Sequence, residues 1–173
     1  MAERYAIPLV GLKEGRHTFE FEIKEAFFEQ FEESEVKEGS LLVKVEIEKR
    51  SSLAELTIRI EGGIKICCDR CLEMFLHPVE CEDRLIVKFG RSVGDDDPDV
   101  VSLPVDAPEL DLMQHFYEFI MLALPIRRIH PDGSDGESTC DPEMLAKLRE
   151  HLTEEEHDND PRWDELKKLI NDN

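Results

Sequence analysis

Apolar and polar residues alternate over much of the first half of the chain, and this pattern predicts a sheet with one buried face. The strands are expected over residues 5–12, 17–23, 41–49, 53–61 and 78–89. Only three residues join the third and fourth of these, which predicts an antiparallel hairpin. Gly62-Gly63 predicts a turn into a further strand that carries Ile64 and Ile66. Pro8 places the first strand at an edge or a bend.

Helical spacing replaces the alternation at two places before residue 126. The phenylalanines of residues 26–35 lie on one face of a short acidic segment, so we expect a helix there that ends at Gly39. A second helix is expected over residues 112–124, because Asp111 can cap its start and Pro125 ends it. Its broad apolar stripe should pack on the sheet.

Two more helices are expected in the last third of the chain. One starts at Asp141-Pro142 and the other at Asp160-Pro161, since Asp before Pro is typical of a helix start. The second helix has an apolar face that must dock on some surface. That face consists of Trp163, Leu166, Leu169 and Ile170.

These elements predict an α+β fold. We expect a twisted antiparallel sheet, or a partly closed barrel, covered by the central helix. Residues 1–125 would form this β-rich domain, and residues 126–173 a loop and an acidic, helical C-terminal arm. We expect a monomer.

The charge limits the choice of partners. The net charge is −20, from 41 acidic and 21 basic residues, so phosphates and anionic lipids repel the protein on average. We therefore expect neither DNA nor a membrane as a partner, and any action on RNA needs a local basic patch or a protein partner. Five cysteines, an odd number, and the lack of a signal peptide indicate a reducing, cytoplasmic location.

The candidate chemistry centres on Cys68 and Cys71. Their Cys-x-x-Cys spacing lets two thiolates enter one tetrahedral zinc site, which needs two more ligands. His130 and Cys140 are the natural pair, because both lie in a loop that could fold back on the first two. The sequence thus predicts one structural zinc ion held by these four residues.

Other cysteines fit such a site less well. Cys81 and His77 are nearer in sequence, but Cys81 lies inside a strand pattern, where a buried thiol is common. Cys67 alternates to the opposite side of its strand. The alternative is that all five thiols are reduced and merely fill space.

No catalytic residue can be assigned from the sequence. A redox Cys-x-x-Cys normally opens a helix after a strand of a βαβ unit, whereas these surroundings are antiparallel and Asp69 adds a negative charge. We expect a protein that is not an enzyme, and the alternative is a thiol- or metal-dependent enzyme acting on RNA or protein. Candidate contacts to RNA or a partner are Arg70, Arg127, Arg128 and Trp163. The arginines could position phosphates but not read bases, whereas the helix around Trp163 would bind a partner protein or dock on the sheet.

Several short motifs follow one another in a recognisable order. They are Cys68-Asp69-Arg70-Cys71-Leu72-Glu73, Leu110-Asp111-Leu112, Leu122-Ala123-Leu124-Pro125, the pair His130 and Cys140, and Asp160-Pro161-Arg162-Trp163. In this order and spacing, over residues 64–170, the chain resembles the YceD family of large ribosomal RNA subunit accumulation proteins.

The resemblance implies a cytosolic protein that supports the synthesis, processing or stability of 23S ribosomal RNA. The partner would be large-subunit rRNA or a ribosomal or assembly protein, contacted directly or indirectly. Some members have a cysteine where this chain has His130, which supports a ligand role for that residue. No catalytic residues come with the family.

Overall fold

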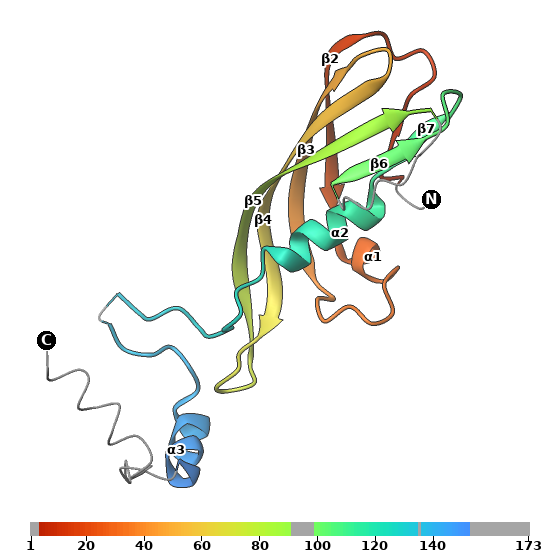
Figure 1. Ribbon diagram of the computed structural model, residues 1–173. Coiled ribbons are helices and arrows are strands. Elements are labelled where there is room, and N and C mark those ends of the chain that lie inside the picture. The colour runs from red at the N-terminus through yellow and green to blue at the C-terminus, as the bar shows by residue number, and fades with distance from the viewer. Residues whose placement is uncertain (1–3, 91–98, 135, 153–173) are drawn as a thin grey trace, which may run out of the picture.

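The computed structural model describes residues 4–90, 99–134 and 136–152, and shows a long twisted sheet with α1 and α2 beside it (Figure 1). Five strands pair in the order β2-β3-β4-β5-β6, and a separate ladder pairs β1 with β7. The strands are β1 Ala6–Pro8, β2 Gly15–Ile23, β3 Gly39–Lys49, β4 Leu53–Cys67, β5 Met74–Phe89, β6 Val100–Leu103 and β7 Glu109–Asp111. The helices are α1 Glu25–Phe28, α2 Met113–Leu122 and α3 Pro142–His151.

The predicted α+β class and twisted sheet are confirmed. Neighbouring strands are antiparallel, except that the short β6 runs parallel to β5. In the described part of the chain β2 and β6 are the two edges of this sheet, so the sheet stays open and does not close into a barrel. The alternation seen in the sequence sets its faces: Val43, Val45, Ile58 and Ile60 are fully buried, and their neighbours along each strand are more exposed.

The expected turn at Gly62-Gly63 is wrong. β4 continues through both glycines to Cys67, and it stays paired with β3 on one side and β5 on the other. Gly62 has a φ of +148°, and a Cβ at this position would lie 2.3 Å from the carbonyl oxygen of Ser40. The glycine allows two backbones to approach closely within the sheet, and this is why it does not end the strand.

Two further expectations are corrected near the N-terminus. α1 covers a single turn, Glu25–Phe28, and Phe31 beyond it stacks on Tyr117 of α2 with ring centroids 3.9 Å apart. Gly39 begins β3 and does not end a helix, and a Cβ there would lie 2.8 Å from a methyl carbon of Ile64. The first strand ends at Pro8, because the chain then turns instead of continuing to residue 12.

α2 covers the core as predicted. It spans Met113–Leu122, and its Phe116, Phe119 and Ile120 are buried in the same cluster as the inner face of the sheet. Asp111 lies one residue before the cap position, but its carboxylate still accepts a hydrogen bond from the Met113 N–H at 2.9 Å. The helix ends just before Pro125, from which the arm leaves the core.

The arm is described up to residue 152 and contains α3. Asp141 caps this helix, because its carboxylate accepts hydrogen bonds from the N–H groups of Glu143 and Met144. The predicted helix at this point is therefore confirmed. The expected last helix and Trp163 lie outside the described residues. No helix in the described ranges is long and apolar enough to span a bilayer.

Candidate metal centre

The turn between β4 and β5 carries the Cys-x-x-Cys motif at the tip of the longest hairpin. We call residues 68–71 the knuckle. The Cys68 N–H donates to the Glu73 carbonyl at 2.9 Å, and the Leu72 N–H donates to the Cys68 carbonyl at 3.0 Å. Leu72 takes a positive φ of 62°, which lets the chain reverse tightly after Cys71. This turn brings the Cys68 and Cys71 sulfurs together on one side of the hairpin.

The arm brings two more side chains to the knuckle. The Cys140 sulfur lies 3.7 Å from that of Cys68. Nδ1 of His130 lies 3.4 Å from the Cys71 sulfur and 3.6 Å from the Cys140 sulfur. All four ligand atoms lie within 4.8 Å of one another. The four residues that the sequence predicted as a set do converge in the fold.

These distances fit the edges of a small tetrahedron. With Zn–S of about 2.3 Å and Zn–N of about 2.0–2.1 Å, two sulfurs are about 3.8 Å apart, and a sulfur and a nitrogen about 3.5 Å apart. The distances Cys68–Cys140, Cys71–His130 and Cys140–His130, which are 3.7, 3.4 and 3.6 Å, match these values closely. Three of the six ligand–ligand distances thus match a tetrahedral metal site, and the four residues together suit such an ion.

The centre is enclosed. The side chains of Cys68, Cys71 and Cys140 are 0, 3 and 4% exposed. Their apolar neighbours are Phe75, Ile129, Met144 and Leu145. The ring of Phe75 lies 4.6 Å from that of His130, centroid to centroid. Four ligands in a closed shell are typical of a structural metal site, whereas a catalytic site keeps one position open for water or substrate.

The backbone around the knuckle favours a thiolate at Cys68. Burial by itself raises the pKa of this thiol, but backbone hydrogen bonds from Cys71, Arg70 and His130, with one from the His130 ring, outweigh burial and lower the pKa to about 6. For Cys140 the hydrogen bond with Ser138 lowers the pKa, but burial and the nearby sulfurs of Cys68 and Cys71 raise it more. The surroundings of Cys68 thus favour its thiolate, which is the form that binds a metal cation.

A second set of contacts joins the arm to the knuckle. The Asp69 N–H donates to the Arg128 carbonyl, and the Arg128 N–H donates to the Asp69 carboxylate, both at 2.7 Å. The Arg128 guanidinium pairs with Glu35 in the segment between α1 and β3. Sequence reasoning missed these partners, because nothing in the pattern marks Asp69 or Glu35 as different from the many other acidic residues.

The comparison with protein families decides the relationship. The family model described as "Large ribosomal RNA subunit accumulation protein YceD" matches residues 56–170. The chain belongs to the YceD family. The resemblance expected from the motifs is thus confirmed. No curated protein and no solved structure matches the chain significantly.

The remaining sequence candidates of this YceD protein lie in different surroundings. Arg127 is exposed, Arg70 is half-buried, and Arg128 is engaged with Glu35. Trp163 belongs to the residues that the structure does not describe. Of these three arginines, Arg127 is therefore the one that is exposed.

The other cysteines are separate from the centre. Cys81 lies in β5 opposite Ile60, and burial together with the charge of Asp83 raises its pKa to about 11. Cys67 is exposed on the other face of the hairpin. Among the described residues, the knuckle and the arm form the one cluster of three or more potential metal ligands.

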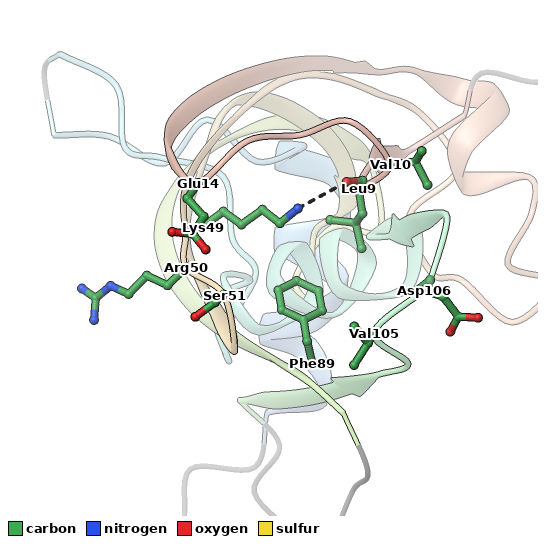
Figure 2. A pocket seen from close by; sticks show the side chains of 10 residues that line it. Leu9, Val10, Glu14, Lys49, Arg50, Ser51, Phe89, Val105 and Asp106 are labelled. Carbon is green, nitrogen blue, oxygen red and sulfur yellow. Dashed lines mark hydrogen bonds between the residues drawn. The ribbon is translucent and has the colours of Figure 1, made fainter.

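The YceD protein also has a surface hollow of about 360 Å³ at the other end of β4 (Figure 2). β4 has 15 residues, so at about 3.3 Å per residue the hollow lies roughly 45 Å from the knuckle. Its central cation, Lys49, donates to the carbonyls of Leu9 and Leu12 at 3.3 and 2.7 Å. Glu14 and Asp106 lie at the rim. Because the amine is already used inside the fold, the hollow offers no converging group for a ligand.

Proposed function

We propose that this protein supports the accumulation of large-subunit ribosomal RNA as a non-enzymatic factor, and that its metal centre holds one structural zinc ion. The observation that carries the proposal is the family match, which covers the knuckle, α2 and both arm ligands. The stretch that relates the chain to the family is thus the stretch that builds the centre.

Zinc is the metal that best suits these ligands. Three sulfurs and one imidazole nitrogen in a tetrahedral arrangement are a common structural zinc set, and soft thiolates disfavour magnesium and calcium. A bound ion would tie the start of α3 to the tip of the hairpin. Its closed shell leaves no place for a substrate, which favours an architectural role over catalysis.

The charges favour a protein as the immediate partner. The net charge of −20 opposes contact with phosphates, and a direct RNA contact gains little from the arm because Arg128 is paired with Glu35. A large-subunit ribosomal or assembly protein, which is itself in contact with rRNA, would avoid this repulsion. We therefore infer that the protein acts on large-subunit rRNA through such a partner.

Depletion in cells tests the cellular role. We expect the ratio of 23S to 16S rRNA to fall, and the wild-type chain to restore it. Cys140→Ser should restore it poorly, whereas Cys81→Ser, a matched change outside the cluster, should restore it fully. An equal loss of 23S and 16S rRNA would contradict the ribosomal role.

Binding of the purified protein to 23S rRNA tests the inferred mode of contact. We expect weak binding at physiological salt and little gain at low salt, since the net charge of −20 opposes phosphates and Arg128 is paired with Glu35. Tight binding with a steep salt dependence would show direct contact with RNA and would rule out the need for a protein partner.

A further inference from the structure

Three apolar side chains are exposed at the tip of the β4–β5 hairpin, which projects beyond α1 and α2 (Figure 1). Leu72, Met74 and Leu76 are 66, 55 and 68% exposed. Met74 and Leu76 alternate with Phe75 along β5, so they point away from the face on which Phe75 contacts the metal-ligand cluster. We call Leu72, Met74 and Leu76 the outer patch, and the face that carries them the outer face.

The neighbours of the outer patch make it continuous. Met74 lies opposite Cys67 of β4. The side chain of Leu76 extends over Gly63, where a Cβ would lie 3.0 Å from one of its methyl carbons. The Cys67 thiol donates to the Leu72 carbonyl at 3.4 Å, which places the Leu72 backbone beside the same face. Single exposed apolar residues are common, whereas a contiguous apolar patch with a polar rim is typical of a docking site.

Carboxylates border the outer patch. Further along the outer face, Glu61 of β4 lies directly opposite Glu80 of β5. No lysine or arginine in the described part of the chain forms an ion pair with either of them. Lys65, opposite Leu76, is paired with Glu38. Because like charges directly opposite each other destabilise a pair of strands, a cation from another molecule would be favoured between Glu61 and Glu80.

We propose that the outer patch binds a short basic segment of a large-subunit ribosomal protein. Apolar side chains of that segment cover the outer patch, and a lysine or arginine lies between Glu61 and Glu80. The class of partner rests on the proposed function, whereas the apolar and basic character of the segment follows from the surface itself. Proteins in contact with rRNA carry the lysines and arginines that phosphate binding requires, and these complement the acidic rim.

The same surface disfavours other occupants. A second copy of the chain would bring its own Glu61 and Glu80 toward an equally acidic molecule, and like charges across an interface oppose association. A stable interface between two proteins buries about 800 Å² on each partner, more than three side chains provide. RNA and anionic lipids are repelled by the unpaired carboxylates. A short cationic segment therefore suits the outer patch best.

Zero-length cross-linking identifies the partner and the contact. The full-length protein is mixed with the proteins of the large ribosomal subunit, freed of rRNA, and a carbodiimide then joins carboxylates to neighbouring lysine amines. We expect mass spectrometry to find Glu61 or Glu80 joined to a lysine of one large-subunit protein. Absence of such links would overturn the proposal. So would links from these residues to an isotope-labelled second copy, or to residues 153–173 of the same chain.

Alkylation of Cys67 measures how well the outer patch is covered, because its exposed thiol lies opposite Met74. We expect the large-subunit proteins to slow this alkylation. Leu72→Ser combined with Leu76→Ser should weaken binding at least about tenfold, since the burial of two leucines is lost. Val105→Ser is the matched control, because Val105 is 78% exposed beyond β6, and it should bind as wild type. Equal protection of Cys67 in both variants, or protection by 23S rRNA alone, would overturn the proposal.

Glu61→Gln combined with Glu80→Gln separates binding from folding. The free variant should melt at a higher temperature than wild type, because the repulsion between the two strands is removed. The large-subunit proteins should nevertheless protect its Cys67 less. A merely damaged fold would lower both the melting temperature and the protection. Protection equal to that of wild type would overturn the proposal.

Complementation separates this proposal from the proposed function. In depleted cells, Leu72→Ser combined with Leu76→Ser should restore the ratio of 23S to 16S rRNA poorly, and Val105→Ser should restore it fully. Full restoration by the leucine variant would overturn the docking surface and leave the proposed function standing. Depletion without a specific loss of 23S rRNA would instead contradict the proposed function, while the cross-links still decide what the outer patch binds.

Discussion

Replacing Cys140 by serine tests whether the metal centre holds the arm on the hairpin. Apart from the metal ligands, the arm is tied to the knuckle by two hydrogen bonds between Asp69 and Arg128 and to the neighbouring loop by the ion pair with Glu35. Each hydrogen bond contributes about 1 kcal/mol, and an ion pair with so exposed a carboxylate less than about 1 kcal/mol. These polar contacts therefore supply less than about 3 kcal/mol, besides the packing of Ile129, Met144 and Leu145 around the cluster.

A bound metal ion would contribute more than these polar contacts. At a free concentration about a thousandfold above its Kd, an ion that binds only the docked arm stabilises it by about 4 kcal/mol. Loss of one ligand should remove most of this term and lower the equilibrium constant for docking by up to about a thousandfold. A bound ion would thus decide whether the arm stays docked on the knuckle.

Metal content and amide hydrogen exchange measure the two consequences. The wild-type protein should contain about one zinc per chain and protect the amides of residues 126–148. Cys140→Ser should lose the zinc and this protection but keep the protection of β3 and β4. Cys81→Ser, the control outside the cluster, should behave as wild type. A wild-type protein without bound metal, or a Cys140→Ser variant that keeps both zinc and arm protection, would refute the reasoning.

Three other predictions follow from the same structure. In metal-free protein, the pKa of Cys68 is about 6 and lies below its usual value of 9.0. The thiolate therefore stabilises the fold above pH 9, and this contribution is lost as the pH falls through 6. Thermal melts of wild type and Cys68→Ser should differ at pH 9 and converge below pH 6. Limited alkylation at pH 8, followed by mass spectrometry, should modify the exposed Cys67 long before Cys81, whose pKa of about 11 keeps it protonated. Gly62→Ala should lower the free energy of unfolding in urea by about 2–5 kcal/mol, because the backbone is strained and the new Cβ would lie 2.3 Å from a backbone oxygen. Gly15→Ala has open space around it and should lower this free energy only by the strain. Equal losses for the two variants would contradict the steric explanation.

The sequence contained enough information for the strands and the ligand set. The alternation of apolar and polar residues depends only on which face of a sheet is buried. The positions of β2, β3 and the first part of β4 could therefore be predicted from the sequence. The ligands could be predicted because His130 and Cys140 lie in loop sequence. A His or Cys in a loop is not accounted for by packing in a core. Cys81 could be excluded as a ligand because it lies in a strand pattern, where packing accounts for a buried thiol. The structure places it in β5, away from the cluster.

The tertiary environment decided the elements that the sequence could not predict. Two adjacent glycines look the same in a sequence whether they form a turn or let two backbones approach each other closely. At Gly62 the two cases are distinguished by Ser40 of the adjacent strand, whose carbonyl oxygen lies where a Cβ would be. In the same way, three phenylalanines at helical spacing indicated a helix longer than α1. The ring of Phe31 is instead used to stack on Tyr117, more than 80 residues later in the chain.

The continuation of β4 through Gly62 has a consequence for the centre. A turn at that glycine would have ended the strand near residue 62. The continuous strand instead runs five residues further, to Cys67, and so holds the knuckle beyond the core that α2 covers. There the small apolar cluster around the knuckle takes Phe75 from β5 and Ile129, Met144 and Leu145 from the arm. An isolated hairpin end with so little apolar surface is marginally stable in water. A metal ion shared between the hairpin and the arm would compensate for this deficit on both sides, which would explain why two of the four potential ligands come from each.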